Sequence, residues 1–308
     1  MVRSNWANAT ALARWKRRRR FSMSSLLFIL PPLIVYVSFV AYPFVHTVLI
    51  SFTNWDGLSA ERQWVGFGNY AAALLEDRQF WRAFGNNIWW VILGTTAPII
   101  IALPLAALVT ARKLKGRNFF RTVFFMPVIL PPMIVGIIWG WVYNPVFGLL
   151  NEVLEAIGLE VFTRPWLGDP NLALTSLIAS AVWAYFGFCF VIFVAALQNV
   201  DVSLLEAAEI DGANSRQRFM KVTIPQLRDV ITMVGVYTFI GGFTSIFDII
   251  WGTTRGGPAG ATEVLTTLIY RRGFEYHRFG YASAIAVILA VVVIVSSVVS
   301  VRLRERKA

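Results

Sequence analysis

The sequence predicts an all-α polytopic membrane protein with six transmembrane helices. Two bulk properties point to this class: 57% of the 308 residues are hydrophobic and only 15% are charged. A soluble domain carries about 25% charged residues, and a chain this apolar lacks the polar side chains needed to cover a water-exposed surface. The composition therefore excludes an ordinary soluble enzyme and a disordered tail.

Six apolar stretches are long enough to cross a bilayer, which takes about 20 residues of helix. The expected spans are Leu26–Ser51, Phe84–Ala111, Phe119–Tyr143, Leu172–Leu197, Val230–Trp251 and Tyr281–Val301. The membrane domain then covers residues 26–301, between a basic N-terminal segment (1–25) and a basic tail (302–308). Two proline pairs, Pro31-Pro32 and Pro131-Pro132, predict kinks in the first and third spans.

The distribution of positive charge predicts the orientation. With the N-terminus in the cytoplasm, twenty of the 28 Lys and Arg residues fall in cytoplasmic segments and eight in outer loops. The positive-inside rule then predicts a multi-pass protein of the inner (plasma) membrane with both termini cytoplasmic. This topology accounts for the net charge of +11, so we expect membrane lipid as the surroundings and no nucleic-acid partner. Tryptophans expected near the outer ends of the spans form an interfacial belt: Trp55, Trp81, Trp89, Trp90, Trp139, Trp141 and Trp251.

The sequence offers no catalytic or metal site. It contains no Gly-Lys dipeptide, and so no Walker-type phosphate-binding loop. Its two histidines, His46 and His277, are far apart, and the single cysteine, Cys189, excludes a cysteine-based zinc site and an internal disulfide; we expect Cys189 to be a small core residue. We expect no catalytic residue, no metal and no bound cofactor. Such a chain moves something across the membrane, forms a pore or anchors a complex.

The loop between the fourth and fifth expected spans, residues 201–228, carries the clearest local signal. Ser203 followed by Glu206 forms a capping-box pattern, which predicts the start of a short helix. Gly212 is placed to end that helix in a left-handed conformation. A second helix is expected from near Asn214, and Pro225 is expected to interrupt the chain before the fifth span.

Physical chemistry alone leaves two interpretations of this loop. It is either a connector lying on the membrane surface or a docking helix for a partner protein. In the second case its acidic residues meet basic residues of the partner, and its small residues allow a close approach. The acidic residues are Glu206, Glu209 and Asp211.

The spacing within the loop favours the second interpretation. Glu-Ala-Ala is followed after three residues by Gly and after nine more by Val, one residue, Ile and Pro. This arrangement resembles the Glu-Ala-Ala loop of binding-protein-dependent ABC importer permeases, with Val222 and Ile224 in place of the usual Ile and Leu. The resemblance implies a cytoplasmic coupling helix that docks into a groove on an ATPase. The implied coupling residues are Glu206, Ala207, Ala208, Asp211, Gly212, Ala213, Phe219 and Pro225.

Outer segments of the chain extend the resemblance. Residues 65–70, 144–151, 166–170 and 247–249, with Gly256-Gly257-Pro258, are similar to loops of the maltose, glycerol-3-phosphate and multiple-sugar permeases. The resemblance implies a type I ABC importer subunit for a sugar, oligosaccharide or related polyol. Such a subunit forms half of the pathway and works by alternating access. The implied partners are a second homologous permease chain, two ATPase subunits that bind ATP and Mg²⁺, and an extracytoplasmic sugar-binding protein.

Five residues at the ends or in the middle of spans are candidate substrate contacts. Asp248 is the only acidic residue well inside an apolar stretch, where charge is costly. It either accepts a hydrogen bond from a sugar hydroxyl or forms a gate contact, or it pairs with Arg255 or another outer arginine. Mid-span aromatic residues either stack on a sugar in a midplane site or pack between helices. The candidates are Asp248, Trp183, Tyr185, Tyr237 and Asn87.

Two alternatives to the importer subunit remain open at this stage. One is an ATP-independent six-span carrier that works as a homo-oligomer; the scarcity of membrane-embedded carboxylates argues against proton coupling in it. The other is a membrane anchor with no pathway of its own. The sequence does not identify the sugar.

Overall fold

The computed structural model describes residues 23–110 and 114–305. The described chain is helical, and its only β pairing is one isolated bridge between Thr53 and Trp64. The predicted basic N-terminal segment lies almost entirely outside the described residues, as do Arg112, Lys113 and the end of the basic tail. The chain divides into two compact units, residues 1–49 and 50–308.

The described part of the first unit is helical throughout. It comprises α2 (Met23–Tyr36), a π turn η1 (Val37–Ala41) and most of α3 (Tyr42–Ile50). These run on as one apolar helix over Leu27–Ile50. The helix continues through Pro31-Pro32, so the proline pair does not end it. A proline pair removes only two backbone donors, and a membrane helix tolerates this loss.

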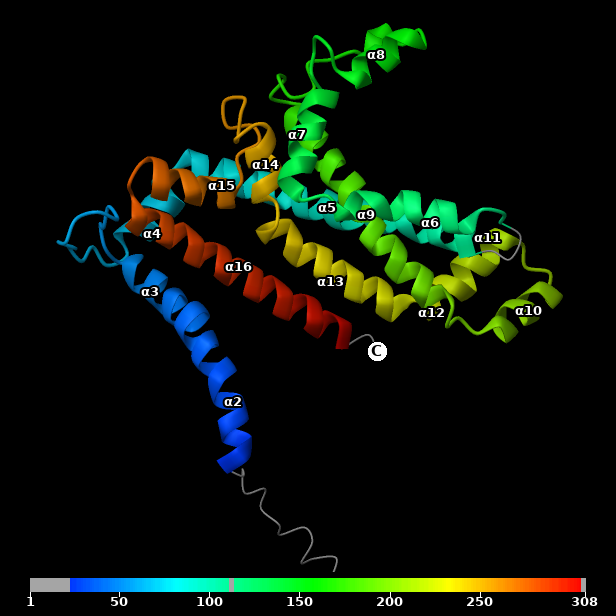
Figure 1. Cartoon of the computed structure of the whole chain (residues 1–308), viewed down its shortest axis with the longest axis horizontal. Helices are drawn as coiled ribbons and strands as arrows, with labels where there is room; N and C mark the ends of the chain where they lie inside the picture. Colours follow the sequence, from blue (N-terminus) through cyan, green and yellow to red (C-terminus); the bar gives the residue numbers. More distant parts are fainter. Residues whose placement is uncertain (1–22, 111–113, 306–308) are drawn as a thin grey trace, which may run out of the picture. The chain divides into compact units, whose positions relative to one another are not determined.

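The second unit holds the remaining elements (Figure 1). In chain order they are α4 (Gly68–Ala71), η2 (Ala72–Glu76), α5 (Arg78–Thr110), α6 (Arg117–Phe125), η3 (Met126–Ile129), α7 (Pro132–Val142), α8 (Leu149–Ala156), η4 (Glu160–Phe162), α9 (Ala173–Leu197), α10 (Val202–Ile210), α11 (Ser215–Arg218), η5 (Phe219–Thr223), α12 (Ile224–Gln226), α13 (Arg228–Thr244), α14 (Phe247–Thr253), α15 (Leu265–Tyr270), η6 (Arg271–Glu275) and α16 (Phe279–Glu305).

The helices agree with six spans when bent helix pairs are counted as single crossings. Among the described residues, four helices are long and apolar enough to span: Leu27–Ile50, Arg78–Thr110, Ala173–Leu197 and Phe279–Val299. Two further pairs qualify together, Arg117–Ile129 with Pro132–Val142, bent by 102°, and Arg228–Thr244 with Phe247–Thr253, bent by 47°. The first bend lies at the predicted Pro131-Pro132 pair. The second, at Ser245 and Ile246, was not predicted.

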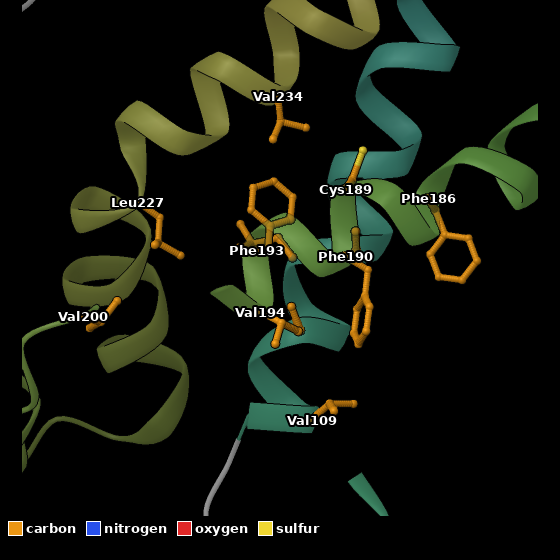
Figure 2. Close-up of a cluster of buried hydrophobic side chains, with 12 residues drawn as sticks. Val109, Phe186, Cys189, Phe190, Phe193, Val194, Val200, Leu227 and Val234 are labelled. Atoms are coloured by element: carbon orange, nitrogen blue, oxygen red, sulfur yellow. The ribbon is translucent and has the colours of Figure 1, made fainter. Parts of the chain in front are cut away.

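A cluster of buried apolar side chains joins α5, α9 and α13. We call it the α5–α9–α13 cluster, and Figure 2 shows its side chains gathered between these helices. Cys189 is fully buried within it, which confirms the predicted core role. The buried members are Ala102, Leu103, Ala106, Val109, Phe186, Cys189, Phe190, Phe193, Val194, Val200, Leu227 and Val234.

Glycines allow α7 and α14 to cross at backbone distance. A Cβ placed on Gly136 of α7 would lie 2.6 Å from the carbonyl oxygen of Ile249. A Cβ on Gly252 of α14 would lie 2.8 Å from the carbonyl oxygen of Met133. Because backbone atoms cannot yield as a flexible side chain does, both positions require glycine.

We expect Gly136→Ala to lower the free energy of unfolding by about 1–3 kcal/mol, because the added methyl forces the two helices apart. The measurement is the thermal unfolding midpoint of the detergent-solubilised protein. Gly85→Ala is the matched control, since Gly85 lies in α5 and an added Cβ meets nothing within 4 Å. Equal midpoints for Gly136→Ala and Gly85→Ala would contradict the close crossing.

Candidate functional site

The predicted coupling loop begins with a helix capped by Asp201. The Asp201 carboxylate accepts a hydrogen bond from the backbone N–H of Ser203 at 2.9 Å and is the N-cap of α10. Bonds from the hydroxyl and N–H of Ser203 hold the pKa of Asp201 below its usual range. The predicted capping box of Ser203 and Glu206 is therefore wrong: α10 begins at Val202, and a carboxylate is an equally favourable cap at the positive end of a helix.

Gly212 ends α10 as predicted. Its φ is +82°, in the left-handed region. The N–H of Ala213 donates to the carbonyl of Ala208 at 2.9 Å, and the N–H of Gly212 donates to the carbonyl of Glu209 at 3.0 Å. These two bonds form a Schellman motif, which closes a helix through a left-handed glycine.

The second helix of the loop is fixed to the first by charge. Asn214 and Gln217 form a reciprocal capping box at the start of α11, which confirms the predicted start. The Arg218 guanidinium pairs with the Glu209 carboxylate across the turn. Glu209 is thus used within the loop, and the helix–turn–helix forms one braced unit.

The loop has a buried side and an exposed side. Phe219 and Leu205 pack against the α5–α9–α13 cluster, so Phe219 anchors the loop to the bundle. Glu206 and Ala207 are exposed, and Ile210 is 87% exposed. The remaining predicted coupling residues divide in the same way, with Ala208 and Ala213 half-buried and Asp211, Gly212 and Pro225 exposed.

A cavity of about 200 Å³ lies between α5, α9 and α13. Tyr185 and Tyr237, two of the predicted substrate contacts, line it together with Trp90 and Phe188. The rings of Phe188 and Tyr237 are 4.9 Å apart. The cavity offers aromatic faces and hydroxyl groups, the two kinds of surface that a sugar ring uses.

Asp248 lies near this group of residues. It is exposed in the first turn of α14 and interacts electrostatically with Tyr185. Among the salt bridges of the described residues there is none between Asp248 and Arg255. Two of the five predicted contacts, Tyr185 and Tyr237, therefore line the cavity, and Asp248 is not among its lining residues.

The other two predicted contacts do not line the cavity. Trp183 packs edge-on against Trp139 of α7, with ring centroids 5.6 Å apart. Asn87 is fully buried; its side-chain oxygen accepts from the N–H of Leu265 at 2.7 Å, and its NH₂ group donates to the carbonyl of Gly242 at 3.5 Å. Asn87 thus ties α5 to α13 and to the start of α15.

Sequence reasoning missed the role of Trp90. The expected belt position is wrong for it, because Trp90 is only 3% exposed and faces the cavity. Its neighbour Trp89, by contrast, is 57% exposed. Helical geometry turns adjacent residues by about 100°, which puts the two rings on different faces, but composition alone did not indicate which ring turns inward.

A buried ion pair supports the loop that precedes α15. Glu263 is 4% exposed, and its carboxylate accepts from Nη1 of Arg271 at 2.5 Å. Nη2 of Arg271 donates to the carbonyl of Arg255 at 2.5 Å. Burial raises the pKa of Glu263, while a hydrogen bond from Thr267 and the charge of Arg271 act in the opposite direction. This pair was not predicted, because its partners meet only in the folded chain.

Removing Arg271 should leave the Glu263 carboxylate buried without its counter-charge. We expect Arg271→Gln to destabilise the protein by about 3–5 kcal/mol, the usual cost of breaking a buried pair. The double variant Glu263→Gln/Arg271→Gln should recover much of that loss, because neither charge is then buried alone. The measurement is the unfolding midpoint of both variants; a double variant as unstable as the single one would show that the charge pairing is not the cause.

These features together define a polytopic membrane protein with two bent spans, a cavity between α5, α9 and α13, and a braced, exposed loop. The chain belongs to the family described as binding-protein-dependent transport system inner membrane components, which matches residues 94–308.

Curated relatives match nearly the whole chain. The probable ABC transporter permease protein YurN of Bacillus subtilis is 35% identical, over 90% of this chain and 94% of its own length. The diacetylchitobiose uptake system permease protein NgcF of Streptomyces coelicolor is 32% identical, over 91% and 82%. The sn-glycerol-3-phosphate transport system permease protein UgpA of Agrobacterium fabrum is 31% identical, over 91% and 94%.

A solved structure shares the fold. A chain of a bacterial alginate ABC transporter, in complex with an alginate pentasaccharide-bound periplasmic protein, superposes with a TM-score of 0.80. It is 23% identical and covers 93% of this chain and 96% of its own length. The all-α permease fold predicted from the sequence is therefore confirmed, and the described helices are consistent with the predicted six spans.

Proposed function

We propose that this chain is a transmembrane permease subunit of an ATP-driven importer for a sugar, oligosaccharide or related polyol. The observation that carries the proposal is the loop at residues 201–228. It presents the exposed Glu206 and Ala207 on one side and anchors Phe219 in the α5–α9–α13 cluster on the other. A helix held in this way transmits displacement by a docked protein to the helices that line the cavity.

The proposed partners follow from this arrangement. Two ATPase subunits bind ATP and Mg²⁺ and dock on the coupling loops of this chain and of a second, homologous permease chain. An extracytoplasmic binding protein delivers the substrate. This chain supplies half of the pathway and performs no catalysis, and both of its termini lie in the cytoplasm, as the distribution of Lys and Arg predicts. Alternating access follows from relative motion of the two permease chains.

The substrate class is supported by the cavity and by the relatives. Tyr185, Tyr237 and Trp90 line the cavity, and aromatic faces with nearby hydroxyls suit a sugar ring. Relatives that match over most of this chain are named for diacetylchitobiose, multiple-sugar and glycerol-3-phosphate uptake. We propose Tyr185, Tyr237 and Asp248 as pathway contacts.

The coupling role is tested by substituting the glycine that ends α10. Gly212→Pro should reduce substrate uptake by about tenfold or more, because proline cannot adopt a left-handed φ and the helix ending is lost. Glu206→Ala should act in the same direction by removing an exposed contact. Uptake and ATPase rate are measured on the assembled complex in proteoliposomes.

Gly158→Pro is the matched control for this experiment. Gly158 also follows a short helix, has a φ of +77° and meets nothing within 4 Å of an added Cβ, but it lies outside the coupling loop. It should retain ATP-coupled uptake. Normal uptake by a fully assembled Gly212→Pro complex would remove the coupling role, and uptake that persists without ATP would favour the homo-oligomeric carrier.

A further inference from the structure

A second, polar pocket of about 290 Å³ lies at the outer turns of α5 and α9. Its lining includes Arg82, Asn86, Trp89, Asn171, Thr175 and Ala261. It is distinct from the aromatic cavity: on α5, Trp90, Gly94 and Pro98 face the cavity, whereas Arg82, Asn86 and Trp89 face this pocket. We call it the outer pocket.

Arg82 is the only charged residue that lines the outer pocket. Its Nη1 donates to the carbonyl of Ala259 at 2.7 Å, and no carboxylate of the described residues forms a salt bridge with it. The nearby Asp169 uses its Oδ1 on the backbone and side-chain N–H groups of Asn171. Arg82 therefore keeps its positive charge and most of its five N–H donors for a ligand.

The other polar groups of the outer pocket are held in place by the fold. Asn86 donates to the carbonyls of Ala261 and Glu263 at 3.0 and 2.7 Å, which leaves its side-chain oxygen as an acceptor. Glu263 is itself held by Arg271. Thr175, in the first turn of α9, is itself exposed and lines the pocket, so it can serve as a reporter position. The binding groups of the site are thus a fixed acceptor and a cation.

Trp89 supplies an apolar face beside these polar groups. It is 57% exposed and stacks on no other aromatic ring of the described chain. A tryptophan that only marks the membrane interface faces lipid, whereas Trp89 shares a pocket with one cation, two amides and a hydroxyl. A ring face next to several hydrogen-bonding groups matches a sugar, which has apolar C–H faces and a rim of hydroxyls.

We propose that the outer pocket binds one sugar ring, stacked on Trp89, and that Arg82 gives it a preference for rings that carry a carboxylate. The volume is near the lower end of the roughly 300–1,000 Å³ of small-molecule sites, which suits a single ring. Arginine binds carboxylates in a bidentate manner. The proposal rests on the proposed import function and adds a subsite through which substrate passes before it reaches the aromatic cavity.

Protection of a single cysteine from a membrane-impermeant maleimide tests this proposal in the assembled complex. The reporter is Thr175→Cys in a Cys189→Ala background, since Cys189 is the only native cysteine and is buried. The probes are D-glucuronate and D-glucose. We expect both to slow modification, with glucuronate effective at a roughly tenfold lower concentration, the usual advantage of a charge-assisted pair.

Variants of the pocket separate its two parts. Arg82→Gln should raise the glucuronate concentration needed for protection to that needed with glucose. Trp89→Ala should abolish protection by both sugars. Trp141→Ala, an exposed tryptophan of α7 outside the pocket, should change neither. A reporter at Glu155→Cys in α8, also outside the pocket, should not be protected.

Two results would overturn the proposal. The first is unprotected Thr175→Cys in complexes that still import their substrate, which leaves the import function intact and removes the subsite. The second is protection of the reporter by phosphatidylglycerol vesicles but not by phosphatidylcholine vesicles, together with no protection by either sugar. That result would identify a site for a lipid headgroup. Loss of all ATP-coupled uptake by the unaltered complex is a separate outcome, and it counts against the proposed function itself.

Discussion

The bilayer imposes one constraint on which the rest of this structure depends: every backbone N–H and C=O at membrane depth needs a partner inside the protein. Long helices without proline meet the constraint along their length by themselves, as α9 and α16 do. Interruptions are tolerated only where neighbouring groups replace the lost hydrogen bonds. At the bend before α7, the N–H of Leu130 bonds to the carbonyl of Pro127 at 3.1 Å, and at the end of α13 the N–H of Ser245 bonds to the carbonyl of Gly241 at 2.8 Å. At both bends, therefore, a backbone hydrogen bond forms between residues next to the bend.

One of the two helix breaks also borders the aromatic cavity. Thr244, Ser245 and Ile246, at the break between α13 and α14, line the aromatic cavity. Irregular backbone at membrane depth is found where it is buried in protein or borders a cavity. Gly136 and Gly252 complement this break, because they let α14 lie directly on α7. The same residues that depart from regular helix thus determine where the cavity lies.

Patterns local to the sequence were sufficient for much of the fold. Apolar length identified the crossings, Pro131-Pro132 identified one bend, and Gly212 identified the end of α10, because each depends on neighbours along the chain. Other features depend on the folded chain. The buried roles of Asn87 and Trp90 arise from contacts of α5 with residues distant in sequence, and the pairing of Glu263 with Arg271 depends on the path of α15 between them. The cap at Asp201 was missed because Ser203, two positions further along, offered a competing cap, and the bend at Ser245 has no proline to mark it.

The anchoring of Phe219 has a mechanical consequence. Its ring packs against the same cluster that holds the facing sides of α5, α9 and α13, and the salt bridge from Arg218 to Glu209 stiffens the turn that leads to it. In the proposed function the loop therefore acts as a short lever. A rotation imposed on α10 would pass through Phe219 to α5, α9 and α13, the helices that also line the aromatic cavity.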